Sequence, residues 1–483
     1  MIKKYSQNLI ETSTAIFIVA AVSIFIFANF IVGFSLPLYL FAVAFGFVLS
    51  VVYPRSGFYA IVFLTVIFER FFTLVPIYWN RAEYKIYPID IIFAGVILGI
   101  IFQLIKNGLP RKLKIADYLV AVFIFAGAAY FIASAYLLRT DASIAFSTFK
   151  NYSFYGLFYF VVIFLFSDKE RLLRLLKFFM AGAVVATIFI FIGIIRGEGL
   201  WTGFTPLSTP GTRILAFPHA FFFTMAVLVS LAWIAFRKDS YATFLKIMIP
   251  IWAIGIVGSL MRHLWISLFV SIIFIFFLLP KENRNRLKKI MFHYALIGVI
   301  AMIFLSYLSF LFPASDFSKT FASATGITGK RFVSTVQVTS DESLNWRKSV
   351  WQSTWREYKD NLIFGLGYGK KVSVEIGTKY KDFVEIRNIH NSLLTIFIQM
   401  GLWSALLFAS LFWLLAKPLL MKVSRAFDPF DLQFLKIAFL AIFLNYLIAF
   451  LFQTYLETNL LGIFFWIILG GLAVLNSNTK IES

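Results

Sequence analysis

Long apolar runs recur along almost the whole of this 483-residue chain. Runs of about 18 or more mainly apolar residues are long enough to cross the hydrocarbon core of a bilayer as α-helices. With 60% hydrophobic residues, 61 phenylalanines and only 14% charged residues, the composition excludes an ordinary soluble domain. The sequence therefore predicts an all-α, polytopic integral membrane protein.

We count fourteen such runs and expect each to form a transmembrane helix. They lie near residues 13–31, 35–53, 57–78, 87–105, 117–138, 151–167, 175–195, 215–236, 246–261, 263–280, 290–313, 391–416, 434–453 and 458–476. The first eleven fall within residues 1–313 and the last three within 390–483. Residues 314–389 are expected to form one large loop domain between these two sets of helices.

Basic residues are distributed unequally between the two sides of this arrangement. The net charge is +21, and 24 of the 44 Lys and Arg residues fall on one set of alternating loops and termini, whereas the short loops opposite carry seven. The positive-inside rule places the basic side in the cytoplasm. We therefore expect both termini inside and the 314–389 loop outside. Anionic lipid headgroups, rather than nucleic acid, are the expected partners of the charge.

The 314–389 loop contains the pattern of one amphipathic helix. In NWRKSVWQSTWREYKDN (345–361), one helical face carries Val350, Trp351, Thr354, Trp355 and Tyr358. Such a helix is expected to lie on a protein or membrane surface. The glycines of the following IFGLGYGKK (363–371) resemble a phosphate-binding loop. Because the strand and helix that flank such a loop are missing, a glycine turn back toward the membrane is favoured.

Several polar side chains are expected at the outer rim of the helices, namely His219, His263, His390, Arg213 and Arg262. Arg262 is the only ionic group in a tight connection between two apolar helices. An arginine near hydrocarbon costs about 2.5–3.5 kcal/mol at a helix centre and less near the interface, so its position suggests an anionic partner. The alternative is that Arg262 extends to the lipid headgroups.

His390 is expected in the first turn of its helix, where the positive end of the helix dipole disfavours a second positive charge. A neutral imidazole at pH 7 can accept a proton from a hydroxyl. An interfacial histidine that only hydrogen-bonds the loop is the alternative, and a zinc site is disfavoured by the ligand spacing. Asn391, Thr395 and Gln399 form a polar stripe expected to bond a neighbouring helix.

These residues resemble a known family. The segment HNSLLTIFIQMGLWS (390–404) is similar to the His-Asn, nine residues, Gly pattern of the bacterial O-antigen ligase and O-antigen polymerase superfamily. Arg262 directly after a helix end, the spacing from Arg213 to His219, and an outer loop with tryptophans and glycines occur in the same order. The resemblance covers residues 200–416.

The resemblance implies a membrane-embedded, GT-C-type glycosyltransferase of the bacterial cytoplasmic membrane. Its donor would be a glycan on undecaprenyl pyrophosphate, and its acceptor a hydroxyl of a lipid A–core or another glycan. It further implies that Arg213 and Arg262 bind the pyrophosphate and that His390 takes the acceptor proton, with inversion and without metal or cofactor. The other residues expected to bind substrate are Asn391, Trp351 and Trp355. For the tryptophans, packing of the loop helix is the favoured alternative.

Three functions remain open. A ligase is favoured over a polymerase because the outer loop, with one amphipathic helix and a net charge of +4 over 314–389, offers one place for a lipid-anchored acceptor. A transporter or flippase would need ionisable pairs within the membrane, and the only candidate pair is Glu69 with Arg70. Glu457 is expected on the outer side and receives no role.

Overall fold

A computed structural model describes most of the chain. The described residues are 2–32, 35–68, 77–79, 82–84, 87–196, 213–315, 318–319, 321–323, 325–326, 328–329, 342–376, 382–386, 389–423 and 430–478. The Glu69 and Arg70 pair considered for a transporter lies outside these residues.

Helices dominate the described residues. Before the outer loop they are α1 Ile2–Val32, α2 Leu36–Val52, α3 Pro54–Ile67, α4 Pro88–Asn107, α5 Ile115–Ile132, α6 Ala142–Tyr152, α7 Leu157–Leu165, α8 Lys169–Ala186, α9 Ile188–Arg196, α10 Phe217–Phe236, α11 Ser240–Gly258, α12 Arg262–Leu278 and α13 Lys281–Leu311. Helix α15, Glu342–Tyr358, lies within the loop at 314–389. The helices that follow the loop are α16 Ser392–Met400, α17 Leu402–Val423, α18 Phe430–Phe450 and α19 Asn459–Asn478. Two antiparallel hairpins pair β1 Ile77–Trp79 with β2 Ala82–Tyr84 and β3 Val372–Ile376 with β4 Asp382–Ile386.

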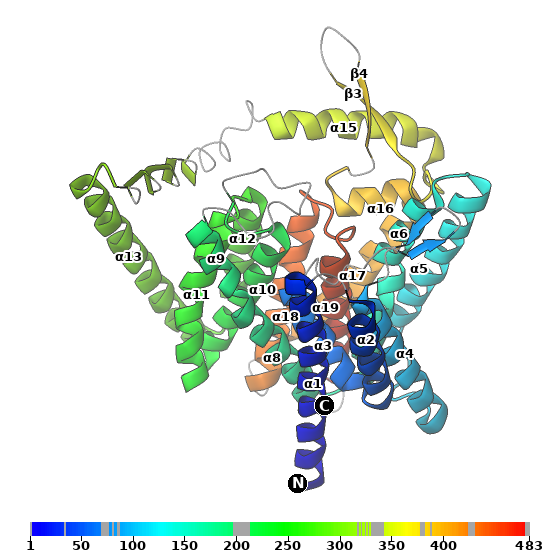
Figure 1. Ribbon diagram of the computed structural model, residues 1–483, viewed down its shortest axis with the longest axis horizontal. Coiled ribbons are helices and arrows are strands. Elements are labelled where there is room, and N and C mark those ends of the chain that lie inside the picture. The colour runs from blue at the N-terminus through cyan, green and yellow to red at the C-terminus, as the bar shows by residue number, and fades with distance from the viewer. Residues whose placement is uncertain are drawn as a thin grey trace.

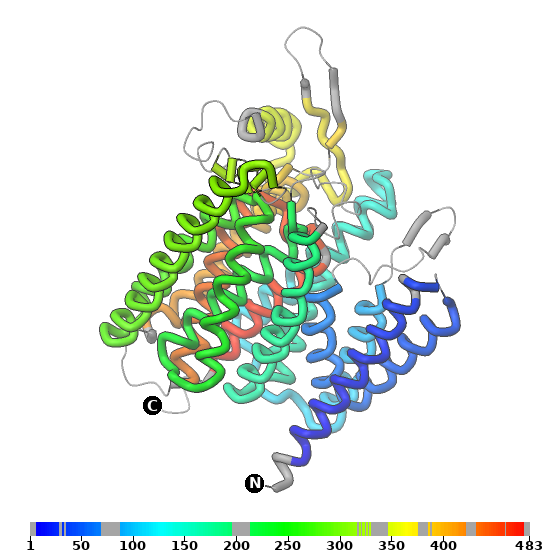
Figure 2. The backbone as a smooth tube through the Cα atoms, turned by 60° about the vertical axis from the view of Figure 1, so that its left-hand side comes forward, coloured from blue at the N-terminus to red at the C-terminus, as the bar shows by residue number. Residues whose placement is uncertain are grey.

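Helices α10, α18 and α19 lie at the centre of the bundle (Figure 1). Their side chains are buried over nearly their whole length. Because these helices are apolar on every side, other helices can surround them in place of lipid. Helix α13 is the opposite case, since its outer half diverges from the bundle and its apolar side chains are exposed (Figures 1 and 2).

Ten helical segments in the described part of the chain are long and apolar enough to cross a membrane, and the apolar helices α2, α3 and α12 are shorter. The chain is therefore a multi-pass membrane protein with about ten candidate spans, and the expected number of fourteen is not confirmed. Several expected spans are interrupted, and two of these breaks are described here. The run at 151–167 is divided between the end of α6, a short turn and α7, and the run at 391–416 breaks between α16 and α17.

The second break, at Gly401, has a tertiary cause. Gly401 has a left-handed φ of 87°, and a Cβ atom there would lie 1.9 Å from the carbonyl oxygen of Ile363. The N–H of Leu402 donates to the carbonyl of Leu362 at 2.8 Å. Only glycine fits this conformation and this close approach. The outer loop therefore passes directly against the chain where the expected long helix bends.

The segment 363–371 is a turn that packs against the helices. Three glycines in it have left-handed φ values of 72°, 86° and 79°, namely Gly365, Gly367 and Gly369. The N–H of Gly367 donates to the carbonyl of Gln399 at 3.0 Å, and the N–H of Tyr368 donates to Ser134 Oγ at 2.7 Å. Donors used in this way cannot cradle a phosphate. The structure thus confirms the turn and contradicts the phosphate-binding alternative.

Helix α15 packs against α16 on the outer side of the bundle. Val350 and Tyr358 are buried in this contact, and the Tyr358 ring lies 4.8 Å from the Phe397 ring, centroid to centroid. A helix therefore forms where the amphipathic pattern lies, and its buried side chains pack against protein. Trp351 and Trp355, expected on the same face, are 38% and 55% exposed.

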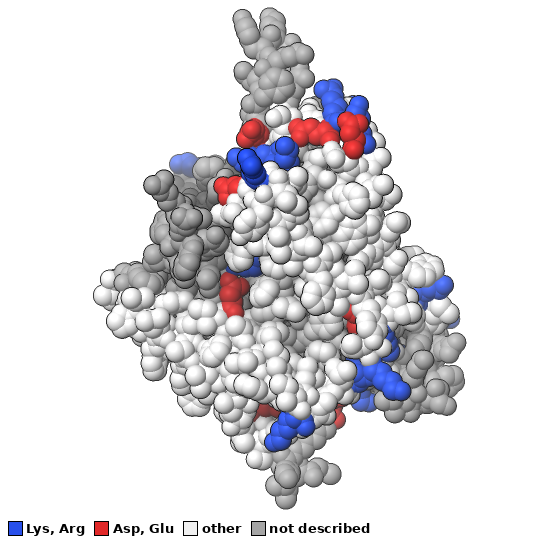
Figure 3. Space-filling view, turned by 90° about the vertical axis from the view of Figure 1, so that its right-hand side faces the viewer, with Lys and Arg blue, Asp and Glu red and all other residues white. Residues whose placement is uncertain are grey.

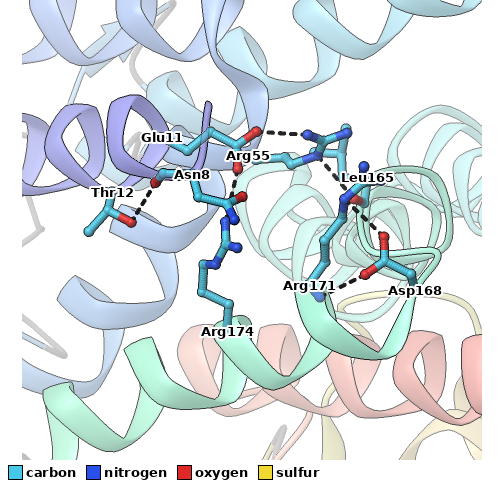
Figure 4. A network of polar contacts seen from close by, with 8 residues as sticks. All are labelled: Asn8, Glu11, Thr12, Arg55, Leu165, Asp168, Arg171 and Arg174. Carbon is cyan, nitrogen blue, oxygen red and sulfur yellow. Dashed lines mark hydrogen bonds and ion pairs between the residues drawn. The ribbon is translucent and has the colours of Figure 1, made fainter. Parts of the chain in front are cut away.

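The two ends of the bundle differ in what they carry. The terminal ends of α1 and α19 point to one side, and α15 with the β3–β4 hairpin covers the opposite side, called the outer side below (Figures 1 and 2). A broad, mostly uncharged surface lies between the charged ends (Figure 3). On the terminal side, Glu11 of α1 pairs with Arg55 at 2.7 Å and with Arg174 at 3.3 Å, which ties α1 to α3 and α8 (Figure 4).

Candidate functional site

His390 lies immediately before α16 rather than in its first turn. It has a left-handed φ of 53°, a conformation uncommon outside glycine and concentrated at functional sites. The helix is capped by Asn391, whose Oδ1 accepts from the Leu394 N–H at 3.0 Å and whose Nδ2 donates to the Leu451 carbonyl at 3.4 Å. Thr395 donates to the Asn391 carbonyl at 2.7 Å, a bond within the helix rather than the expected bond to a neighbour.

The surroundings of His390 favour the neutral form of its imidazole. Its side chain is half-buried, and burial is the largest cause that lowers its pKa below the ordinary value near 6.5. The positive charge of Arg347 in α15 lowers this pKa further, and the hydrogen bond with Gln453 opposes the shift. Burial and the charge of Arg347 thus favour the expected neutral imidazole, and the role of His390 as a base stays a prediction.

The linker at 451–458, between α18 and α19, holds the chain around His390. Nδ1 of His390 lies 2.7 Å from Oε1 of Gln453, and Ser392 Oγ donates to the Gln453 carbonyl at 3.0 Å. Gln453 is 63 residues away from His390 along the chain. Sequence reasoning missed it, because no motif connects the two segments.

The same linker contacts two further elements. The hydroxyl of Tyr455 lies 2.7 Å from Nε2 of His263, in the first turn of α12. The Glu457 carboxylate accepts a hydrogen bond from the Tyr152 hydroxyl, and the Glu457 carbonyl accepts one from Asn151 Nδ2 at 2.9 Å. The linker therefore joins the starts of α12 and α16 to the end of α6.

Arg213 and Arg262 are brought to one place by the turn between α11 and α12. Arg262 begins α12 directly after this turn, in which Leu260 has a left-handed φ of 55°. Arg213 lies beside the turn, because the N–H of Ile214 donates to the carbonyl of Gly258 at 3.1 Å. The glycine permits this approach, since a Cβ atom there would lie 2.3 Å from Ile214 Cδ1.

Three arginine side chains carry charges that act on the imidazole of His263, namely Arg213, Arg262 and Arg347. We call these three residues the outer cation cluster. Arg347 also acts on His390, so the cluster and the neutral imidazole are neighbours on the outer side. Such a cluster can bind a phosphate or pyrophosphate through charge-assisted hydrogen bonds.

His219 does not belong to this group. His219 lies on α10 and its ring is buried. Nε2 of the ring lies 3.0 Å from the carbonyl oxygen of Ile67, and the Phe189 ring is 5.0 Å away, centroid to centroid. The expected convergence of three histidines is therefore wrong for His219, which packs between helices. Among the described residues, no group of three or more His, Asp or Glu side chains is placed to hold a metal ion.

The two tryptophans of α15 lie in different surroundings. Nε1 of Trp351 donates to the carbonyl of Ile389 at 3.0 Å, directly before His390. Trp355 is more exposed, and its ring lies 6.1 Å from the Tyr358 ring. Trp351 thus supports the chain around His390. Binding of substrate by the tryptophans and by Asn391 stays a prediction.

Comparison with known families leads to the same region. Residues 247–409 match the family model described as O-Antigen ligase. The match includes Arg262, Arg347 and His390, whereas Arg213 and the 451–458 linker lie outside it. No curated protein matches the chain. The chain is therefore a multi-pass membrane protein with about ten candidate membrane spans, and its residues 247–409 are similar to the O-antigen ligase family.

Proposed function

We propose that the protein is an O-antigen ligase-like glycosyltransferase. It transfers a glycan from undecaprenyl pyrophosphate to an acceptor hydroxyl at the outer face of the cytoplasmic membrane, with both chain termini inside. The observation that carries the proposal is the position of Arg347, whose charge acts on both His263 and His390. If the outer cation cluster binds the pyrophosphate of the donor, the anomeric carbon of the attached sugar would lie beside a neutral base.

In the proposed reaction, the outer cation cluster binds the pyrophosphate of the donor. His390 accepts the proton of the acceptor hydroxyl. The acceptor oxygen attacks the anomeric carbon from the face opposite the pyrophosphate. A glycosidic C–O bond forms as the C–O bond to phosphate breaks, and undecaprenyl pyrophosphate leaves with the bonding electrons. The configuration inverts, and the arginines stabilise the charge that develops on the leaving group.

The different roles of base and cations can be separated by substitution. In a detergent assay of sugar transfer, His390→Ala should lower kcat by about 10²–10⁴-fold and leave binding of the lipid donor nearly unchanged. Arg262→Ala should weaken both, and Arg262→Lys should restore them only in part, because an ammonium does not reproduce the planar guanidinium. Wild-type transfer by the His390 variant would refute the proposal. A wild-type protein without transfer would favour a transporter or flippase.

The scheme gives no step to a metal ion, because three guanidinium groups supply the positive charge at the leaving group. Transfer should therefore continue in excess EDTA. A complete loss of transfer that added divalent metal restores would overturn this part of the scheme.

We favour a ligase over a polymerase. In the described part of the chain, α15 covers one outer cation cluster beside His390, which suits one pyrophosphate donor and one lipid A–core or other glycan acceptor. A polymerase would hold a second lipid-linked pyrophosphate as acceptor. A deletion strain should accumulate long lipid-linked chains that are not attached to their acceptor. Single repeats attached to the acceptor would instead identify a polymerase.

A further inference from the structure

His390 can act as a base only if the nitrogen that faces the acceptor carries the lone pair. In a neutral imidazole one ring nitrogen carries the proton and the other accepts, and the hydrogen-bond partner of one decides the state of both. Nδ1 of His390 lies 2.7 Å from Oε1 of Gln453. Because an amide oxygen only accepts hydrogen bonds, this contact places the proton on Nδ1 and leaves Nε2 as the acceptor.

Gln453 is itself held in place from two directions. Its carbonyl accepts a hydrogen bond from Ser392 Oγ at 3.0 Å, and the same Oγ accepts from the N–H of Leu456 at 3.3 Å. Its own N–H donates to the carbonyl of Ala449 at 3.2 Å, at the end of α18. The backbone of Gln453 is thus fixed to the start of α16, directly beside His390. A side chain held in this way can orient an imidazole as carboxylates and carbonyls orient metal-binding histidines.

The linker also fixes the base relative to the cations. Two residues beyond Gln453, the Tyr455 hydroxyl contacts His263, which lies among the arginines of the outer cation cluster. One short segment therefore contacts both imidazoles. A shift of this segment would move His390 and His263 together.

We propose that Gln453 is a positioning residue that fixes the tautomer of His390, so that Nε2 takes the proton of the acceptor hydroxyl. This inference rests on the proposed function, because it requires His390 to act as a base. The charged group that acts on His390 is Arg347 of α15. His263 at the start of α12 and Tyr455 contact each other at the same linker. In this proposal Gln453 contacts the imidazole of His390 and acts through it, without contacting the substrate.

Two substitutions of Gln453 test the role of its oxygen. Gln453→Met keeps the length of the side chain but removes the acceptor, so both tautomers become accessible, and kcat should fall by roughly 10- to 100-fold. The KM for the lipid donor should change by less than about twofold, because the cations are intact. Gln453→Glu keeps an acceptor and adds a negative charge that stabilises the imidazolium. This variant should stay active, and the acid limb of its kcat profile should move to higher pH.

Gln352→Met is the matched control. It makes the same substitution at an exposed position of α15, so kcat should stay within about twofold and the acid limb should not move. An equal loss in Gln453→Met and Gln352→Met, or full activity in Gln453→Met, would overturn the inference. If Gln453→Met does not fold, the kcat profile of Gln453→Glu decides the question. A shift of its acid limb to higher pH would support the inference, and an unchanged acid limb would overturn it. Full activity of His390→Ala would refute the proposed function itself, whereas an inactive His390→Ala beside a fully active Gln453→Met would refute only the role of Gln453.

Discussion

Arg347 connects the two halves of the candidate site, yet its position in the sequence did not single it out. It lies four residues before Trp351 and seven before Thr354, on one stripe of the α15 helix. Thr354 is fully buried, so this stripe faces the rest of the protein. From this helix the charge of Arg347 acts on His390. A basic residue on the apolar stripe of a loop helix is the signal that would have found it.

The pH dependence of transfer should report this contact. Arg347 helps to lower the pKa of His390, so Arg347→Ala should raise it. A protonated imidazole cannot accept a proton, and the acid limb of the kcat/KM profile should therefore move to higher pH, where activity is lost sooner on acidification. Lys348→Ala, which removes an exposed charge of the same sign one residue further on, should leave the acid limb in place. Identical profiles for the two variants would contradict the contact.

At the scale of elements, the presence of many apolar helices was predictable, whereas the number of membrane spans and the interruptions of the helices were not. Apolar runs mark helices because a lipid or protein interior must surround them on every side. The bend at Gly401 depends instead on the backbone of Ile363, which the fold brings against it. The motif around His390 and Arg262 could be located because it follows helix ends that the apolar runs define. The contact with Gln453 joins two loops separated by 63 residues, and no local pattern records it.

The bend between α16 and α17 should be sensitive to a single methyl group. Gly401→Ala puts a side chain at φ 87° and ψ 179°, a region essentially restricted to glycine, which costs about 1–3 kcal/mol, and it places the new Cβ against the Ile363 carbonyl. The unfolding temperature in detergent, followed by tryptophan fluorescence, should fall. Gly298→Ala in α13 is the control, because nothing lies within 4 Å of its Cβ position and a helix favours alanine. Equal unfolding temperatures for the two variants would contradict this account of the bend.

For the whole molecule, the expected orientation requires the α15 side to face outward. The chain contains no cysteine, so single cysteines can report on each side. Asp360, after α15, and Asn285, near the start of α13, are both exposed and lie on opposite sides of the bundle in this scheme. Asp360→Cys should react with an impermeant thiol reagent in intact cells, and Asn285→Cys only after permeabilisation. If Asn285→Cys reacted in intact cells and Asp360→Cys only after permeabilisation, the candidate site would lie in the cytoplasm, and the proposed function would be refuted.

The region that matches the O-antigen ligase family is not a unit that can be exchanged alone. The glycine turn within residues 247–409 rests on Ser134 and on Tyr130, whose hydroxyl donates to the Phe364 carbonyl at 2.8 Å. His390 rests on Gln453, beyond the other end of the match. A chimera that exchanges only the matched segment between two relatives would therefore separate the site from both of its supports. Under the proposed function, changes of glycan specificity should then arise by substitutions spread over the whole chain, rather than by recombination of the matched segment.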